Sequence, residues 1–324
     1  MGVDTLACVF NSVEELGEGM AKSVIMASLD AIRLRGRFTL AVTAGSSLEL
    51  LARTITEEPF LSSLDWPKWN IFFVDERCAP STSPCSSYKM LNDLLLRHVS
   101  IPEMQVYVAF DHTMTLDNLG HTCEPCSLMY QDQIRAVLGG SPSDIPSLDV
   151  VLLSMDEHGN VASFMRGHPI LNHEIKNHEI SWGAEGKLRA LGDAQIAAGM
   201  YECEETITDC VLTERDALLL RGRFPKERVS LTIPMINRAR EVFICASGQR
   251  VAPVLQLYFE KMPDMEIPIT HIKGLTGKPK MFLDQPAVSC LNFPQALRNF
   301  QIVDLTFHFN THKEDAEALC QPGG

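Results

Sequence analysis

Charged and polar side chains follow two apolar runs of the 324-residue sequence, where a strand would end. Asp75, Glu76 and Arg77 come directly after one run, and an arginine there could bind a phosphate through two parallel hydrogen bonds. His158 follows the apolar run at 148–155, and its imidazole could act as a general base. An ion pair or a solvent-exposed loop would explain the same residues, so neither segment identifies a site by itself.

Small residues and two further arginines are candidate anion ligands. Gly45, Ser46 and Ser47 stand between an apolar run and a predicted helix, where backbone N–H groups and the helix dipole favour an anion. An ordinary turn with a helix cap would use the same residue types. Arg228 precedes one apolar run and Arg250 follows another, so each is either an anion ligand or a surface arginine.

The rest of the chain supplies the elements that would position these side chains. Predicted strands lie at 38–43, 70–75, 105–110, 148–155, 229–233 and 241–246. Predicted helices lie at 12–35, 48–55, 87–99, 126–138 and 251–261. This alternation predicts an α/β, Rossmann-like fold with a mostly parallel central sheet and helices on both faces. Ligands bind such sheets at the carboxyl ends of the strands, where the candidate residues stand.

Two stretches interrupt the alternation of strands and helices. Residues 172–226 are polar and weakly periodic, which predicts an insertion. Residues 293–324 predict a C-terminal extension, so that residues 1–292 would form a single domain. The sequence gives no indication of the oligomeric state.

Composition restricts the class of partner. The net charge of −13 argues against general nucleic-acid binding, although a few arginines in one pocket could still hold a phosphate. No apolar run reaches the length of a membrane-spanning helix, and residues 1–20 lack the pattern of a secretory signal. Ten cysteines are too sparse for a disulfide framework, so we expect a reduced, cytoplasmic protein that contacts neither nucleic acid nor membrane.

Two further motifs have metal or redox interpretations. Cys123 and Cys126 form a Cys-x-x-Cys pair, but a zinc site would need a second pair or suitably spaced histidines. His173 and His178 are five residues apart and would not share one helix face as in a His-Glu-x-x-His zinc motif. We therefore predict ordinary thiols and no metal site.

Several segments, taken in order, resemble the 6-phosphogluconolactonase family, which is related to the glucosamine-6-phosphate isomerases. The matching segments are 69–77 (WNIFFVDER), 86–90 (SSYKM), 148–155 (LDVVLLSM), 162–163 (AS) with 167–169 (GHP), 228–237 (RVSLTIPMIN) and 282–284 (FLD). The resemblance covers roughly residues 12–290 apart from the insertion. It implies hydrolysis of a phosphorylated sugar lactone in the pentose phosphate pathway, without a metal or an organic cofactor.

The resemblance also implies roles for individual residues. The family's glycine-rich turn and basic residues hold the substrate phosphate, and a histidine is its base. Asp75 and Glu76 would orient Arg77, and His158, Asn160 and Asp75 are the candidate catalytic residues. The candidate phosphate ligands are Gly45, Ser46, Ser47, Arg77, Arg228 and Arg250.

The sequence departs from the family pattern at the predicted base. An ungapped alignment on Ala162 and Ser163 places Asn160 at the family's histidine and His158 at its aspartate. An amide cannot take a proton from water, so general-base assistance worth ~10²–10⁴-fold would be lost. Ala44 also replaces a glycine of the phosphate turn, which would be strained if the turn requires a positive φ there.

These departures leave three hypotheses about function. In the first, the protein is an active 6-phosphogluconolactonase in which the loop around 155–160 shifts its register, so that His158 reaches the substrate and Arg250 replaces a family lysine. Alternatively, the protein is a non-catalytic relative that binds sugar phosphates or acts through interactions. A third hypothesis is aldose–ketose isomerisation of an amino-sugar phosphate.

Overall fold

The computed structural model describes residues 5–77, 79–109, 123–139, 145–166, 171, 188–191, 196–200, 227–260, 266–275, 279–292 and 300–302. An eight-stranded sheet has the order β12-β1-β11-β10-β6-β2-β3-β5, and all seven neighbouring pairs are parallel. Its strands are β1 (Thr5–Phe10), β2 (Phe38–Val42), β3 (Trp69–Phe73), β5 (Val106–Tyr107), β6 (Val150–Ser154), β10 (Glu241–Ala246), β11 (Lys280–Asp284) and β12 (Phe300–Ile302).

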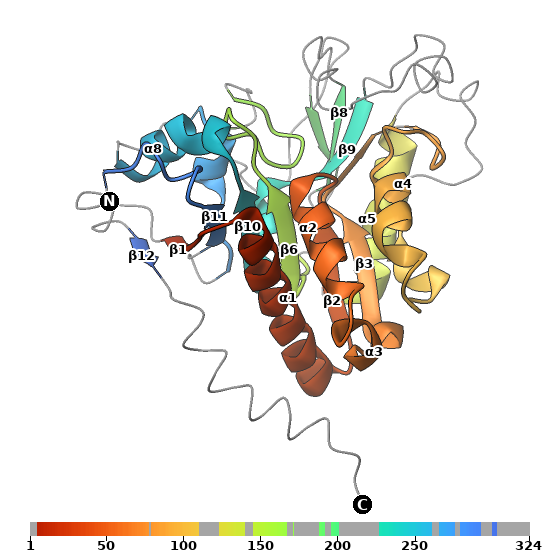
Figure 1. The fold of residues 1–324 in the computed structure, drawn as a ribbon. Helices are drawn as coiled ribbons and strands as arrows, with labels where there is room; N and C mark the ends of the chain where they lie inside the picture. The colour runs from red at the N-terminus through yellow and green to blue at the C-terminus, as the bar shows by residue number, and fades with distance from the viewer. Residues whose placement is uncertain are drawn as a thin grey trace, which may run out of the picture.

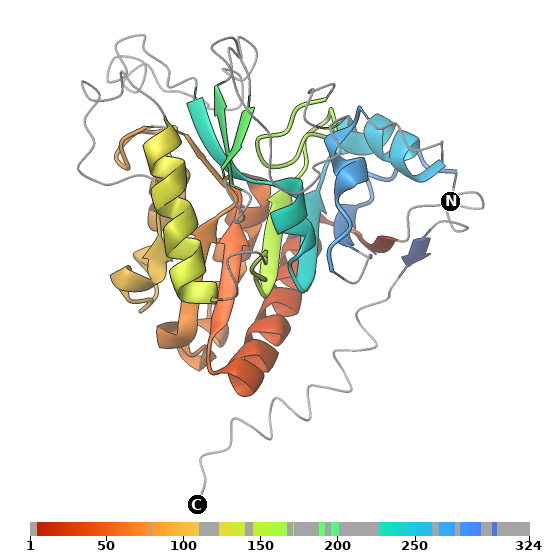
Figure 2. The same ribbon diagram turned by 180° about the vertical axis from the view of Figure 1, so that it is seen from behind.

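Helices cover both faces of this sheet (Figures 1 and 2). Figure 1 shows α1 and α2 in front of the strands, and Figure 2 shows α5 on the opposite face. The helices are α1 (Val13–Arg35), α2 (Ser46–Ile55), α3 (Phe60–Ser63), α4 (Ser87–Leu91), α5 (Cys123–Leu138), α7 (Ile233–Asn237) and α8 (Ala252–Glu260). Shorter turns are the 3-10 helices η1 (Trp66–Lys68), η3 (Glu103–Gln105), η7 (Gln249–Val251) and η8 (Pro268–His271), and the π-helix η2 (Asn92–Leu96).

Successive strand residues face opposite layers of the core. Val150 and Leu152 pack into the apolar cluster that contains residues of α1 and α2, whereas Val151 and Leu153 pack into the cluster that contains residues of α7 and α8. Strands buried on both faces read as continuous apolar runs, which is why the sequence reveals them. The prediction of an α/β fold with a mostly parallel sheet is confirmed.

A second, antiparallel sheet was not predicted. Its strands are β4 (Asp75–Arg77), β9 (Glu227–Leu231), β8 (Ile196–Met200) and β7 (Leu188–Leu191), in that order. The predicted strand at 70–75 is therefore two strands: β3 ends at Phe73, and Asp75 begins β4 in the other sheet. The strand predicted at 229–233 likewise belongs to the antiparallel sheet as β9. In Figure 1, β8 and β9 project beyond the carboxyl edge of the large sheet.

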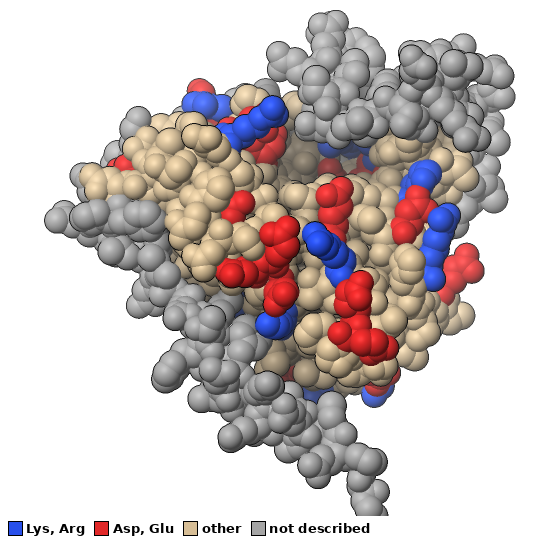
Figure 3. All heavy atoms as spheres, viewed as in Figure 1, with Lys and Arg blue, Asp and Glu red and all other residues tan. Residues whose placement is uncertain are grey.

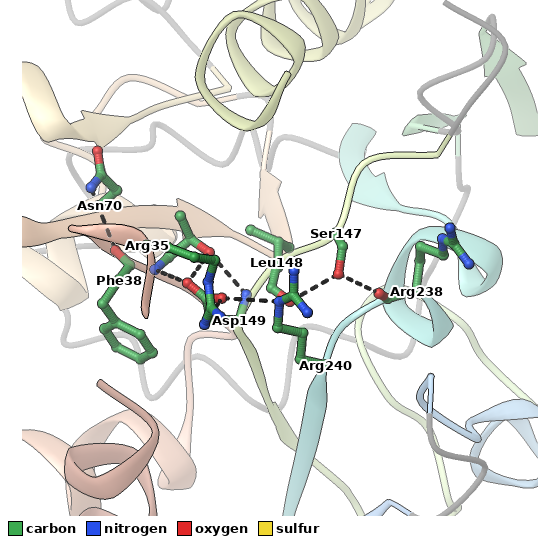
Figure 4. A network of polar contacts seen from close by, with 9 residues as sticks. Arg35, Phe38, Asn70, Ser147, Leu148, Asp149, Arg238 and Arg240 are labelled. Carbon is green, nitrogen blue, oxygen red and sulfur yellow. Dashed lines mark hydrogen bonds and ion pairs between the residues drawn. The ribbon is translucent and has the colours of Figure 1, made fainter. Parts of the chain in front are cut away.

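The amino edge of the large sheet is closed by a polar network (Figure 4). Asp149 accepts hydrogen bonds of 2.9 Å from the N–H and the hydroxyl of Thr39, and it forms ion pairs with Arg35 (2.7 Å) and Arg240 (3.4 Å). The Asp149 side chain is 7% exposed. This buried acid therefore has cations and neutral donors from three separate segments, as buried charges require.

Candidate active site

A cleft of about 850 Å³ opens at the carboxyl edge of the large sheet, where an α/β fold places its ligands. The ends of β2 and β6, the strands β4 and β9, and the α4–η2 segment form its walls. The predicted site residues that line it are Gly45, Ser46, Asp75, Arg77, Asn160 and Arg228. Four segments that are distant in the sequence are thus brought together.

Tyr130 of α5 directs the chain from β3 into the cleft wall. Its buried hydroxyl accepts a hydrogen bond from the N–H of Phe73 (2.7 Å) and donates one to the carbonyl of Phe73 (2.8 Å). The backbone groups of Phe73 are therefore used by a side chain, and β4 begins two residues later in the second sheet. Because side chains alternate along a strand, Asp75 and Arg77 line the cleft, whereas Glu76 points away from it.

Two arginines occupy directly opposite positions in the cleft wall. Arg77 of β4 pairs with Arg228 of β9 in the antiparallel register. Arg77 is buried, and the Arg228 side chain is 22% exposed. Like charges opposite each other destabilise a strand pair unless an anion lies nearby. Asp75 supplies part of this compensation through a contact of 3.4 Å with Arg228, and a bound phosphate would supply more.

The small-residue turn at the end of β2 opens onto the same cleft. Gly45 has a φ of 140°, whereas Ala44 is not among the described residues with a positive φ, so the alanine is not strained. Gly45 precedes α2 and supplies no side-chain cap, and no contact of the described residues uses the N–H of Ser46, the first residue of the helix. Ser46 lines the cleft, although its hydroxyl also bonds to the buried thiol of Cys245.

Ser47 lies behind the turn rather than in the cleft. The side chain is fully buried, its N–H donates to the hydroxyl of Ser154 (3.1 Å), and the two hydroxyls are 2.7 Å apart. Ser154, the last residue of β6, therefore caps α2 from a different segment. The prediction that the Ser47 hydroxyl binds phosphate is corrected, because this hydroxyl already has a buried partner.

Gly159 fixes the register of the loop that follows β6. Its φ is 78°, and a Cβ atom there would lie 2.4 Å from Ile267 and 2.9 Å from Val254. The carbonyl of Gly159 accepts a hydrogen bond from the N–H of Ile269 (3.1 Å). A residue with a side chain cannot occupy this position without displacing its neighbours, so the loop cannot slide by one residue.

This register places Asn160 in the cleft and His158 outside it. His158 is exposed and does not line the cleft, so the predicted register shift is not observed. The Asn160 amide nitrogen donates to Asp156 (2.7 Å), and its amide oxygen accepts from the N–H of Arg166 (2.7 Å). Asn160 therefore braces the loop with both ends of its side chain.

Arg250 also lies outside the cleft, because the 3-10 turn η7 exposes it. The preceding Gly248 has a φ of 83°, and its N–H donates to the carboxylate of Asp284 (3.0 Å). Asp284, part of the segment 282–284 that resembles the family, therefore anchors this turn. The expected phosphate contact of Arg250 is not supported by this placement.

Glu76 holds the backbone that surrounds the cleft. Its carboxylate accepts hydrogen bonds from the N–H groups of Ser87 (2.7 Å), Tyr88 (2.9 Å) and Arg77 (2.8 Å) and from the hydroxyl of Ser86 (3.1 Å). Burial raises the pKa of Glu76 to about 7, although these donors oppose the shift. Glu76 thus orients Arg77 through its main chain and caps α4.

Asp75 is held by a residue to which the sequence assigned no role. The Ser163 hydroxyl donates to Oδ2 of Asp75 (2.8 Å), the same oxygen that Arg228 contacts. Ala162, the residue before Ser163, has a φ of 54°, the only positive φ at a non-glycine position among the described residues. The resemblance included the Ala-Ser pair, which was the available signal for this contact.

None of the described residues that line this cleft comes from the other sequence motifs. Cys123 and Cys126 stand at the start of α5, and His173 and His178 fall outside the residues that the structure describes. Within the described part of the chain, no three His, Cys, Asp or Glu side chains converge as metal ligands would. None of its helices combines the length and apolar composition that crossing a bilayer requires.

Positive and negative side chains are intermixed on one face of the molecule. On the face seen in Figure 3, the Lys and Arg side chains are interspersed with Asp and Glu over the described residues. The paired arginines of the cleft are therefore a local arrangement, not part of a basic surface on that face.

Comparison with known proteins gives relatives over most of the chain. The family model for glucosamine-6-phosphate isomerases/6-phosphogluconolactonase matches residues 11–185 and 201–280. A rice protein (Oryza sativa subsp. indica) named probable 6-phosphogluconolactonase 3, chloroplastic, is 29% identical over 287 residues, which cover 88% of this chain and 75% of that protein.

Solved structures of 6-phosphogluconolactonases share the fold. The Trypanosoma brucei enzyme aligns with a TM-score of 0.67 and 17% identity, over 89% of this chain and 99% of its own. The Trypanosoma cruzi enzyme gives 0.64 and 22%, over 90% and 98%. Since the family model matches well over half of the residues, the chain belongs to the glucosamine-6-phosphate isomerase/6-phosphogluconolactonase family.

Proposed function

We propose that this protein hydrolyses the lactone of a phosphorylated sugar acid, with 6-phosphogluconolactone as the substrate to test first. The observation that supports it most directly is the opposed pair Arg77 and Arg228 beside Ser46, the first residue of α2. Two guanidinium groups and the N–H at the start of a helix form a site for a phosphate dianion. The rice relative, named a probable 6-phosphogluconolactonase, supports the choice of substrate.

The proposed role of the phosphate site is to place the lactone carbonyl. A phosphate held by Arg77, Arg228 and the N–H of Ser46 would leave the sugar ring to extend along the cleft floor. Fixing the ring beside a base and water removes most of the entropic cost of the reaction. No metal or organic cofactor is part of this proposal.

A second candidate is a protein that binds the sugar phosphate without turning it over. The observation that favours it is Asn160, whose amide is hydrogen-bonded at both ends and which the resemblance aligns with the family's histidine. The proposed phosphate site would be the same in both cases. The two candidates differ only in the rate of ring opening.

Hydrolysis of freshly generated 6-phosphogluconolactone, compared with its spontaneous rate in a pH-stat, distinguishes these candidates. We expect the purified full chain to exceed the blank by orders of magnitude, and 6-phosphogluconate to raise its melting temperature. A raised melting temperature without turnover would support the binding protein. If the protein shows neither turnover nor a raised melting temperature, both candidates are contradicted. Ammonia release from glucosamine 6-phosphate would instead support the isomerase hypothesis.

We also propose a reducing compartment such as the cytosol as the place of action. The ten cysteines of the 324-residue sequence are too sparse for a disulfide framework, which supports a reducing environment. The rice relative's name includes the word chloroplastic, so a fluorescent fusion of the full chain should be located against both compartments. A plastid signal would contradict the cytosolic proposal.

A further inference from the structure

We propose that Asp75 is the general base for lactone hydrolysis in this protein and that Ser163 positions it. The inference rests on the proposed function and names the group that activates water. No histidine lines the cleft among the described residues, and Asn160 has no basic atom to offer. Within the described part of the chain, a base at this site must therefore come from another kind of side chain.

Four carboxylates line the described part of the cleft, and three of them are unsuitable. Asp93 forms ion pairs with both Lys89 and Arg97. Asp156 accepts hydrogen bonds from the N–H of His158 and from the N–H and amide of Asn160, so both of its oxygens are used. Glu49 is exposed on α2 and has no contact that would hold it toward a substrate.

Asp75 differs from these three because its two oxygens have different environments. Oδ2 accepts the Ser163 hydroxyl at 2.8 Å and contacts Arg228 at 3.4 Å. Oδ1 accepts no hydrogen bond from the described residues, and the side chain is only 11% exposed. One oxygen is therefore fixed while the other is available to a water molecule in the cleft. Arg228 also places this carboxylate beside the proposed phosphate site.

The proposed step balances without an oxidant or a cofactor. Oδ1 of Asp75 takes a proton from water while the water oxygen bonds to the lactone carbonyl carbon, and the carbonyl electron pair moves onto its oxygen. The tetrahedral intermediate collapses as the ring C–O bond breaks, and the ring oxygen takes the proton back from Asp75. The released acid loses its own proton to solvent, so lactone and water become a carboxylate and a proton.

Ser163 acts through Asp75 and is a positioning residue. The left-handed backbone of Ala162 turns the chain between the bridged residues Val161 and Phe164. This turn points the Ser163 hydroxyl at Oδ2 of Asp75, and the oxygen that remains faces water. Loss of the hydroxyl would let the carboxylate rotate without altering the phosphate site.

Steady-state kinetics of Asp75→Asn with 6-phosphogluconolactone test the proposal, with Asp132→Asn as the control, because Asp132 is an exposed aspartate of α5 that does not line the cleft. Loss of a general base lowers kcat by about 100-fold or more, so we expect at least this effect in Asp75→Asn and wild-type kcat in Asp132→Asn. Both variants should still melt cooperatively and respond to 6-phosphogluconate. Ser163→Ala should lower kcat with an unchanged KM, and Ser163→Thr should restore it.

The outcomes separate this inference from the function on which it rests. If the wild type hydrolyses the lactone and a folded, ligand-responsive Asp75→Asn keeps its kcat, Asp75 is not the base. If the wild type itself equals the spontaneous rate, the hydrolase function fails, and the role of Asp75 fails with it. Adding Asn160→His to Asp75→Asn should restore turnover with a new rise between pH 6 and 7, where histidine loses its proton.

Discussion

A carboxylate is buried at each edge of the large sheet, but the two carboxylates have different kinds of partner. At the amino edge, Asp149 has two arginines and Thr39 as partners from three segments. At the carboxyl edge, Glu76 accepts only N–H and hydroxyl donors in the contacts described above, and the arginines of that edge face the cleft. Ion pairs away from a cleft serve only to stabilise the fold, whereas charged groups in the wall of a cleft can also bind a ligand.

The largest expected effect is at the amino edge. Asp149→Ala leaves the buried N–H and hydroxyl of Thr39 without their acceptor, at about 1–3 kcal/mol for each group, whereas Arg35 and Arg240 are 33% and 48% exposed and can be solvated instead. Urea denaturation should show this loss in the free energy of unfolding. Lactone binding per folded molecule should remain unchanged. Weaker binding in Asp149→Ala would show that a change at the amino edge alters the site at the carboxyl edge.

The buried acid at the carboxyl edge should make stability depend on pH. Burial raises the pKa of Glu76 from 4.5 to about 7, so the folded state holds this proton more tightly than the unfolded state. The free energy of unfolding should therefore fall as pH rises from 4.5 to 7, by roughly 3 kcal/mol from this group. Denaturant midpoints across this range measure it. If Glu76→Gln showed the same dependence of the free energy of unfolding on pH as the wild type, Glu76 would not be the group responsible.

Arg228→Gln should have the opposite consequence from Asp149→Ala. It removes one of two like charges that face each other, so the free energy of unfolding should change little. Substrate binding loses a charge-assisted interaction worth about 1.5–3 kcal/mol, which raises KM roughly 10–100-fold. Arg33→Gln, on the exposed surface of α1, is the matched control for charge. If Arg228→Gln and Asp149→Ala lowered the free energy of unfolding equally, the two edges would not differ in how their charges contribute to stability.

Glycines at the two edges should also differ. Gly36, beyond the end of α1, has a φ of 74° and open space around it, so alanine there costs about 1–2 kcal/mol for the left-handed backbone alone. Gly159 has the same strain together with Ile267 and Val254 in close contact, which adds about 1–3 kcal/mol. Thermal denaturation of both alanine variants gives the difference, and equal losses would mean that the loop shifts to make room.

The sequence predicted where strands end better than it predicted the contacts between distant segments of the chain. Continuous apolar runs identified the buried strands and placed Asp75 and Arg77 at the correct edge. The split between β3 and β4 depends on Tyr130, a residue 57 positions away, and no local pattern signals it. β1 was missed, although Asp4 precedes this six-residue run and Asn11 and Ser12 follow it.

The site predictions failed where two segments compete for one group. Ser47 seemed a phosphate ligand from its turn, but Ser154, 107 residues later, takes its hydroxyl. The register of His158 and Asn160 depends on Gly159 meeting Ile267, which is again a distant contact. Residue type indicated which side chains have suitable chemistry, and only packing decided which of them reach the cleft.

The position of β1 has a consequence for the order in which the chain can fold. This strand pairs in parallel with β11 through contacts such as Leu6 with Lys280, so its partner is synthesised 274 residues later. The centre of the sheet, β2 with β3 and β6, can assemble much earlier. We therefore expect a nascent chain released before β11 to carry an unpaired apolar strand, which chaperones recognise and which favours aggregation.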